Sequence, residues 1–294
     1  MGAQSKREEW FRAGTAVTNE LFDDADGRYL CPLCLRWFDH WSSLSREHAP
    51  PQSVGGHRVA LTCTDCNSGA GSSIDAQLRR AENIREFASR AMGQAIPATF
   101  SVEGITLRVE MQFGPDGLTI VGVPKQNHPE ITAAQTALFE RLAAQGHWDG
   151  TTLQVTFAGA NFRAAAVGWL RSAYLVAFAA LGYRYILRPE LNVVRQQISE
   201  PTEHHLERFC LMVGGGTVGR ERRILLVNRP RSLESVAVFS NECVTFLPGF
   251  GRGANIYEQL ALRKRWPPRG GDLAGKEVPW PTGPSFMFDR RPTP

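Results

Sequence analysis

A regular spacing of apolar residues marks a helix in the first third of the chain. Apolar residues recur there at about every third or fourth position, at Ile74, Leu78, Ala81, Ile84 and Phe87. That spacing places them on one face of an α-helix. Just before it, "HRVALTC" (57–63) broadly alternates polar and apolar residues after a Gly-Gly pair at 55 and 56, which favours a two-stranded ribbon. We therefore predict strand, turn, strand and helix within residues 28–92.

The rest of the chain predicts more strands with two helices between them. "FSVEGITLRVEMQFGPDGLTIVGVP" (100–124) indicates paired strands around a Pro-Asp-Gly turn, followed by a helix within 129–144. "TTLQVTFAG" (151–159) is typical of a strand, and "NFRAAAVGWLRSAYLVAFAALGY" (161–183) of a long, largely buried helix. Later strands are expected in "RRILLVN", "VAVFS" and "CVTFLP". This order favours an α+β fold with a mostly antiparallel sheet.

Hydropathy and the N-terminal residues argue against a membrane protein. The most apolar run, "SAYLVAFAALGY" (172–183), has twelve residues with Arg171 at its edge, whereas a membrane span needs about twenty. The first residues, "MGAQSKREEWFRAG", are charged where a signal peptide would be apolar. We expect a cytoplasmic protein with no membrane partner.

Length and composition allow one large domain or two moderate ones. The chain has 294 residues, of which 43% are hydrophobic, so a sizeable core is expected. We predict an N-terminal helical segment (1–27), a metal-stabilised domain (28–96), a larger α+β domain (97–265) and a tail (266–294) that holds seven prolines. The tail is expected either to wrap the domain through Trp280 and Phe286 or to stay mobile.

Four of the six cysteines form two Cys-x-x-Cys pairs, "CPLC" (31–34) and "CTDC" (63–66). In a reducing compartment such pairs indicate zinc thiolates more than disulfides. Four thiolates complete the tetrahedral coordination of one structural Zn²⁺, here from Cys31, Cys34, Cys63 and Cys66. The 28 residues between the pairs exceed the roughly 15 to 20 of common zinc ribbons, so further structure is expected between them.

That insertion contains "SREHAPPQSVGGHRVALTCTDCNSGAG" (45–71), in which Glu47-His48 precedes the second cysteine pair and Asn67 directly follows it. With the predicted helix, residues 28–92 resemble the HNH endonucleases, which have a treble-clef-like ββα-metal fold. The resemblance implies that His48 is the general base, that Glu47 binds a catalytic divalent metal and that Asn67 orients His48. The third position of the motif, eight residues after Asn67, holds Asp75, which the resemblance makes a second ligand of that metal.

The chemistry of these residue types suits phosphodiester hydrolysis. An imidazole has an unperturbed pKa near neutrality and can activate water, and carboxylates are ligands for Mg²⁺ or another hard divalent cation. Each residue also has a structural interpretation. His48 and Glu47 could be plain surface residues, Asn67 could cap the turn after the cysteine pair, and Ser72-x-x-Asp75 matches a capping box at the start of the helix.

The net charge of +4 is unevenly distributed. Residues 1–92 contain 11 basic and 12 acidic side chains, so the excess of basic residues lies beyond them. Arginines are candidates for contacts to DNA phosphates, although a solvated basic surface has the same composition. The candidates are Arg79 and Arg80 on the predicted helix, and Arg222, Arg223, Arg263 and Arg265 in two arginine-rich stretches.

Two functions are therefore compatible with the sequence. The first is a metal-dependent endonuclease that cuts DNA, for example in restriction or phage defence, with a C-terminal domain that recognises DNA, senses a trigger, or binds a protein partner or a second copy of the chain. The second is a non-catalytic, zinc-stabilised module that binds nucleic acid or protein. The combination of Glu47, His48 and Asn67 favours the nuclease, because a binding module needs no base.

Overall fold

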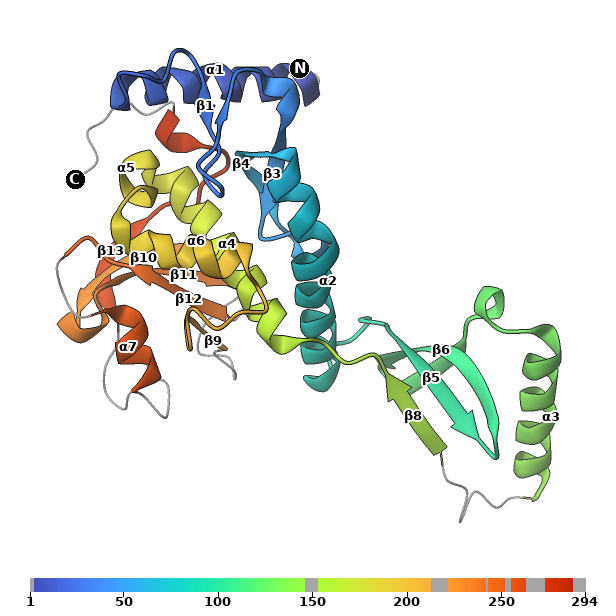
Figure 1. Cartoon of the computed structure of the whole chain (residues 1–294). Helices are drawn as coiled ribbons and strands as arrows, with labels where there is room; N and C mark the ends of the chain where they lie inside the picture. The colour runs from blue at the N-terminus through green and yellow to red at the C-terminus, as the bar shows by residue number, and fades with distance from the viewer. Residues whose placement is uncertain are drawn as a thin grey trace. The chain divides into compact units, whose positions relative to one another are not determined.

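The computed structural model describes residues 3–145, 153–212, 222–241, 243–251, 255–262 and 273–287, and it divides the chain into two compact units. The larger unit consists of Met1–Leu78 and Phe162–Pro294, and the smaller one of Arg79–Asn161 (Figure 1). Both combine helices with antiparallel sheets, so the predicted α+β class is confirmed.

The N-terminal part of the larger unit is a helix followed by two short hairpins. Helix α1 (Ala3–Leu21) precedes β1 (Tyr29–Leu30) and β2 (Trp37–Phe38), which pair antiparallel. A 3-10 turn η1 (Trp41–Ser43) leads into β3 (Leu44–Ala49), which pairs antiparallel with β4 (His57–Cys63). Helix α2 (Thr64–Ala88) follows directly. The strand, turn, strand and helix that the sequence predicted are therefore present.

The turn between β3 and β4 explains the Gly-Gly pair. The 3-10 turn η2 (Gln52–Val54) ends at Gly55, whose φ of 81° is left-handed. The backbone of Gly56 lies so close to the Pro50 carbonyl that a Cβ atom would stand 1.4 Å from its oxygen. Only glycine fits at this point, and the hairpin can therefore close tightly at the end away from Cys63.

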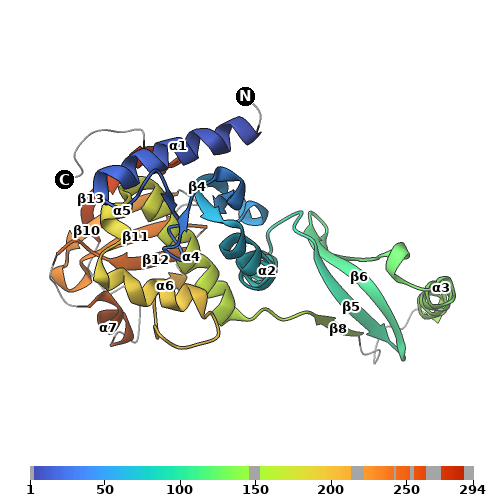
Figure 2. The same cartoon turned by 45° about the horizontal axis from the view of Figure 1, so that its top comes forward.

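The remainder of the larger unit is a five-stranded antiparallel sheet with helices (Figure 2). The strands, in spatial order, are β13 (Ala274–Val278), β10 (Arg223–Arg229), β11 (Ser235–Ser240), β12 (Cys243–Pro248) and β9 (Cys210–Met212). The helices are α4 (Phe162–Leu181), α5 (Tyr183–Ile186), α6 (Asn192–Ser199) and α7 (Ile256–Ala261), and 3-10 turns are η4 (Pro189–Leu191), η5 (Arg231–Leu233) and η6 (Ser285–Met287).

Helix α4 joins this sheet to the cysteine-bearing hairpin. It contacts β11 and β12 of the sheet and also β3 and β4 of the hairpin. One hydrophobic core accordingly includes residues from all three, among them Ala60, Leu175 and Phe246. At Gly168 an added Cβ would lie 3.1 Å from the side chains of both Ile74 and Leu78, so this glycine allows α4 to approach α2 closely.

Helix α4 is long and apolar enough to cross a membrane by length and composition, yet 83% of its apolar window is buried within the chain. This is the burial of a core helix, as the sequence predicted for this segment.

The proline-rich tail packs on the larger unit over its described part. Strand β13 pairs with β10, and the Phe286 ring lies 4.8 Å from the Phe178 ring and 5.7 Å from the Tyr183 ring. The Ser285 hydroxyl donates to the Ala179 carbonyl at 3.0 Å. Of the two behaviours considered for the tail, residues 273–287 therefore show the wrapped one.

Truncation of this aromatic contact should weaken the fold. We expect Phe286→Ala to lower the free energy of unfolding by about 1–3 kcal/mol, since the half-buried ring loses part of what a fully buried phenylalanine contributes. Urea denaturation followed by circular dichroism measures the change. The exposed Phe162 on α4 provides the control, and an equal loss for Phe162→Ala would contradict a specific role for the tail.

The smaller unit has its own sheet and core. Strands β5 (Ile96–Val102), β6 (Ile105–Gly114), β7 (Gly117–Gly122) and β8 (Leu153–Phe157) form an antiparallel sheet in the order β7-β6-β5-β8. The 3-10 turn η3 (Pro124–Gln126) precedes α3 (Pro129–Gln145), which packs on β5 and β6 through Leu138 and Leu142. The predicted Pro-Asp-Gly hairpin and the helix within 129–144 are both present.

The division of the chain differs from the predicted boundaries at 96 and 265. Residues 97–161 belong to the smaller unit, whereas Phe162 and the residues after it belong with residues 1–78. The physical reason is the shared core around α4, which unites the hairpin β3–β4 with the C-terminal sheet. The smaller unit is thus inserted between two halves of the larger one in the sequence.

Candidate metal centre and active site

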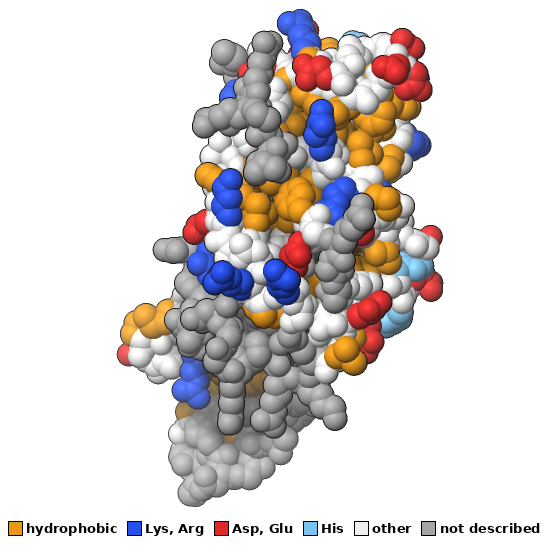
Figure 3. Space-filling model, turned by 90° about the vertical axis from the view of Figure 1, so that its left-hand side faces the viewer, with side chains coloured by type: hydrophobic (Ala, Val, Ile, Leu, Met, Phe, Trp, Pro, Cys, Tyr) orange, Lys and Arg blue, Asp and Glu red, His pale blue; other side chains and the backbone are white. Residues whose placement is uncertain are grey.

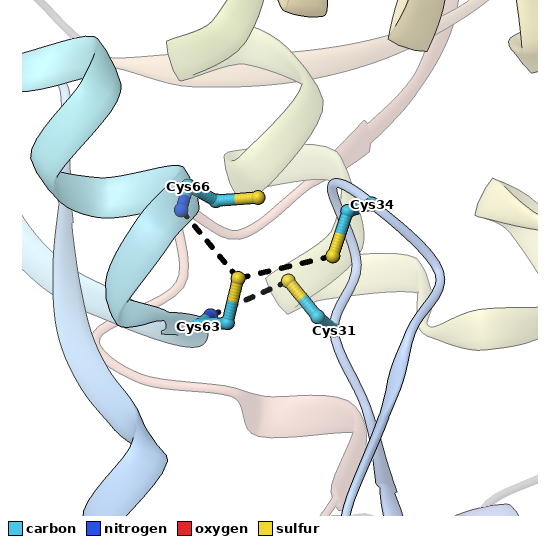
Figure 4. A group of neighbouring side chains, drawn as sticks. All are labelled: Cys31, Cys34, Cys63 and Cys66. Carbon is cyan, nitrogen blue, oxygen red and sulfur yellow. Dashed lines mark hydrogen bonds between the residues drawn. The ribbon is translucent and has the colours of Figure 1, made fainter.

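The four paired cysteines converge on one point in the larger unit. The sulfurs of Cys31, Cys34, Cys63 and Cys66 all lie within 4.8 Å of one another, and the Sγ atoms of Cys34 and Cys63 are 3.8 Å apart (Figure 4). Tetrahedral zinc with Zn–S bonds of about 2.3 Å requires S···S separations of roughly 3.8 Å. The cluster therefore could bind a metal ion such as zinc, and its geometry fits that ion.

Backbone geometry holds the thiols in place. The Leu35 amide donates to the Cys31 carbonyl at 2.9 Å, which closes the first turn, and Leu35 has a left-handed φ of 53°. The Cys63 amide donates to the Cys31 sulfur at 3.4 Å, and the Cys66 amide donates to the Cys63 sulfur at 3.5 Å. Cys66 lies in the first turn of α2, so both strand and helix position the cluster.

A cation stands beside the sulfurs. The Arg36 guanidinium donates to Cys34 Sγ at 3.4 Å and to Cys63 Sγ at 3.7 Å, and it also pairs with Asp65 at 2.8 Å. Four thiolates on one Zn²⁺ leave two negative charges, so a neighbouring guanidinium stabilises the loaded site.

Glu47 and Asp75 meet at a third side chain that the sequence interpretation had not assigned. Nη1 of Arg171, on α4, donates to Glu47 Oε1 at 3.1 Å and lies 3.8 Å from Asp75 Oδ1. Glu47 is 3% exposed and Arg171 is 1% exposed. Burial raises the pKa of the Glu47 carboxyl and that of the Asp75 carboxyl, and the Arg171 charge opposes both shifts.

Several atoms of this cluster have no hydrogen-bond partner. They are Oε2 of Glu47, Oδ1 of Asp75, and Nε and Nη2 of Arg171, all of them buried. Two carboxylates with unpartnered oxygens offer donors of the type that a hard cation takes. The donor atoms are thus of the type that a divalent cation takes, but in this structure the cation that contacts both carboxylates is the Arg171 guanidinium.

His48 lies next to Glu47 on β3 and is half-buried. The pairing of β3 with β4 shifts register between Glu47 and His48, and His48 stands opposite Arg58. Burial lowers the pKa of the His48 imidazole, and the nearby charges of Arg58 and Arg46 and the imidazole of His57 lower it further. A lowered pKa keeps the ring neutral at neutral pH, which is the form that accepts a proton.

Asn67 contacts a different residue of the same strand. Its side-chain Nδ2 donates to the Ser45 hydroxyl at 2.8 Å. Among the residues that the structure describes, no hydrogen bond joins Asn67 to His48. Successive side chains of a strand point to opposite faces. Ser45 and Glu47 are two positions apart on β3, so the residue that Asn67 contacts lies on the same face as Glu47. Asn67 thus fastens α2 to β3 three positions before His48, and its predicted orienting role stays a prediction.

The position of Asp75 in α2 argues against the capping-box interpretation of this residue. Helix α2 begins at Thr64, so Asp75 lies well inside the helix. A capping box needs a helix start, and residue 72 is not one. Through its contact with Arg171, Asp75 belongs to a cluster of charged residues that also includes Glu47. This cluster joins α2, β3 and α4.

No family model, curated protein or solved structure matches this chain.

The predicted phosphate-binding arginines fall into three groups. Arg79 and Arg80 are exposed on α2. Arg222 donates to the Gly55 carbonyl at 2.6 Å, and Arg223 lies over the Phe239 ring at 4.3 Å. On the face that Figure 3 shows, described basic side chains are dispersed among apolar and acidic ones. The remaining two candidates lie outside the described residues, namely Arg263 and Arg265.

Arg171 is the residue that sequence reasoning missed. Its signal was an arginine within "GWLRSAYLVAF", an otherwise apolar stretch of a helix that was expected to be buried. A charged side chain in such a helix requires a partner, but the sequence does not say which carboxylates supply it.

Proposed function

We propose that the chain is a metal-dependent endonuclease that hydrolyses phosphodiester bonds in DNA, with His48 as its general base. The observation that carries the proposal is the convergence of Glu47 and Asp75 on the Arg171 guanidinium, on the same strand-and-helix unit that bears Cys63 and Cys66 of the cysteine cluster. The residue after Glu47 is His48, whose pKa is lowered by burial and neighbouring charges. These are the positions that the resemblance to HNH endonucleases assigns to ligands and base.

Each of these residues has its own role in the proposed reaction. The neutral imidazole of His48 accepts a proton from water while the water oxygen bonds to phosphorus and the bond from phosphorus to the leaving sugar oxygen breaks. Asn67 holds β3 against α2 through Ser45 and so keeps the strand that carries His48 in place. Glu47 and Asp75 would hold the divalent cation, which supplies positive charge to the leaving oxygen when it is bound. Zinc at the four cysteines is structural.

Metal-dependent nicking of DNA tests the proposal. The purified 294-residue chain, loaded with zinc, is incubated with supercoiled plasmid in Mg²⁺, Mn²⁺, Ni²⁺ or EDTA, and relaxed and linear products are measured on gels. We expect nicking with at least one divalent cation and none in EDTA, because the reaction needs charge at the leaving oxygen.

The matched variants in this assay are Asp75→Asn and Asp116→Asn. Asparagine at 75 keeps the size of the side chain but binds a hard cation poorly, so nicking should fall strongly. Asp116 is exposed in the turn between β6 and β7 of the smaller unit, and its variant should cut as the unmodified chain does. Absence of nicking under every metal condition would contradict the nuclease.

One observation favours the second function. The positive charge of Arg171 already neutralises part of the Glu47–Asp75 pair, as in a structural ion pair that needs no metal. If no condition supports nicking, we propose instead a zinc-stabilised module that binds nucleic acid or protein without catalysis. Retention of plasmid on a filter, without cleavage and with strong salt dependence, would support its nucleic-acid-binding form.

A further inference from the structure

Arg171 lies in a place where a charge is costly. It belongs to the apolar helix α4, its side chain is almost completely buried, and it is one of the largest fully buried side chains of the described chain. A buried guanidinium requires paired charges and complete hydrogen bonding to offset its desolvation. Glu47 and Asp75 supply the paired charges, through contacts of 3.1 Å and 3.8 Å to Nη1.

The hydrogen bonding of this cluster is incomplete on both sides. Nη1 makes the contacts to the carboxylates, while Nε and Nη2 have no partner, and one oxygen of each carboxylate has none either. Buried ion pairs that serve only stability are usually satisfied throughout. Unused acceptors on the carboxylates and unused donors on Arg171 leave each side able to take another partner.

Space for such a change adjoins Arg171. A cavity of about 340 Å³ is lined by Arg171 but by neither Glu47 nor Asp75. The cavity is lined by groups that could accept hydrogen bonds from a displaced guanidinium, namely Asp65, Ser73 and Ser199, and also by Arg195. The guanidinium therefore has an alternative location away from the carboxylates and within the same unit.

We infer that Arg171 is an internal cation that competes with a divalent metal ion for the Glu47–Asp75 pair. The identity of that pair as a metal site rests on the proposed function. With Nη1 between the carboxylates the pair is closed to metal, because a guanidinium and a divalent cation at one position repel each other. Metal binding moves Arg171 toward the cavity. Unlike a metal ion, a guanidinium cannot coordinate a water molecule or a phosphate oxygen. The arrangement with Arg171 between the carboxylates is therefore the resting state of the site.

Mn²⁺ binding to the full zinc-loaded chain tests this competition. Free Mn²⁺ is measured by electron paramagnetic resonance in titrations of the unmodified protein, Arg171→Met and the double variant Arg171→Met with Glu47→Gln. Methionine fills a similar volume without charge. We expect Arg171→Met to bind Mn²⁺ at least about tenfold more tightly, since a unit positive charge about 4 Å from the site is removed, and the double variant to lose this gain. Equal dissociation constants for Arg171→Met and the unmodified chain would overturn the inference.

A stability measurement separates competition from a purely structural ion pair. Loss of Arg171 leaves two buried carboxylates without a counter-charge, so Arg171→Met should melt at a lower temperature. We expect Mn²⁺ to raise its Tm much more than that of the unmodified chain. If Arg171→Met does not fold, Arg171→Lys is used in the Mn²⁺ titration instead, because the shorter lysine side chain holds its positive charge farther from the two carboxylates. A several-fold gain in Mn²⁺ affinity is expected for this variant, and none would overturn the inference.

Plasmid cleavage distinguishes failure of this inference from failure of the nuclease. Tighter Mn²⁺ binding by Arg171→Met without nicking by any variant would contradict the nuclease and support the competition. Nicking by the unmodified chain, with no gain in Mn²⁺ affinity on loss of Arg171, would support the nuclease and overturn the competition.

Discussion

The His48→Ala protein should nick plasmid DNA about 10²- to 10⁴-fold more slowly than the unmodified chain, the usual contribution of a general base. The residue is half-buried on β3, and burial together with Arg58, Arg46 and His57 lowers its pKa. Alanine removes the proton acceptor but leaves the carboxylate pair and the cysteine cluster intact. Zinc content, Tm and retention of DNA should therefore stay close to those of the unmodified chain, while the initial rate of plasmid nicking falls.

Two comparisons make this result specific. His128 is exposed in the smaller unit, so His128→Ala should cut at the unmodified rate. Asn67→Ala and Ser45→Ala remove opposite ends of one hydrogen bond, and they should reduce the rate by similar, smaller factors if Asn67 acts by fixing β3. A His48→Ala protein that cuts as fast as the unmodified chain would show that the base lies elsewhere.

Loss of zinc should unfold the larger unit and not only the segment around the cysteines. Structural zinc contributes about 10–16 kcal/mol in small zinc-finger peptides, which is comparable to the whole stability of a typical domain, about 5–15 kcal/mol. Because β3, β4 and α2 share one core with α4 and the five-stranded sheet, Cys63→Ser should destroy cooperative unfolding of this unit. The smaller unit has a separate core, so its backbone amides should stay protected against hydrogen exchange. Hydrogen exchange with mass spectrometry measures both units in one experiment.

The matched control is Cys210→Ala, because Cys210 is a partly buried cysteine outside the cluster. This variant should retain one zinc per chain and exchange slowly in both units. A Cys63→Ser protein that binds no zinc yet melts at the unmodified temperature would contradict a structural metal at the four cysteines. Unfolding confined to residues 28–92 would contradict the energetic importance of the shared core.

The local features of this protein could be predicted because short-range rules decide them. The spacing of the cysteines brings four thiols together once a hairpin and a helix start lie between them, and the apolar repeat through Ile74 and Leu78 determines which face of α2 is buried. The Gly-Gly turn follows from a backbone that excludes a Cβ. In each case the residues that interact are few, and the chemistry of metal ligands, helical periodicity or backbone sterics leaves few alternatives.

The candidate catalytic residues were recognisable for a different reason. Glu47, His48, Asn67 and Asp75 have types and spacings that the HNH resemblance assigns to metal ligands, a general base and the residue that orients it, but spacing does not say which way their side chains face. On β3, the face on which each side chain lies is determined by the alternation of side chains along the strand and by the register shift after Glu47. This is why the structure joins Asn67 to Ser45, and Glu47 and Asp75 to Arg171.

The amino-acid sequence by itself determined the α+β class, the cysteine cluster, the hairpin and helix around it, and the burial of the helix at 162–181. Only the tertiary structure decided that the chain divides at 78 and 162, that residues 273–287 close on α4, and that Arg171 faces two carboxylates more than ninety residues away in the sequence. Periodicity and ligand spacing act between neighbours along the chain. Partners across a core are selected by the packing of whole elements and by the need to neutralise a buried charge, and neither is encoded in any one segment.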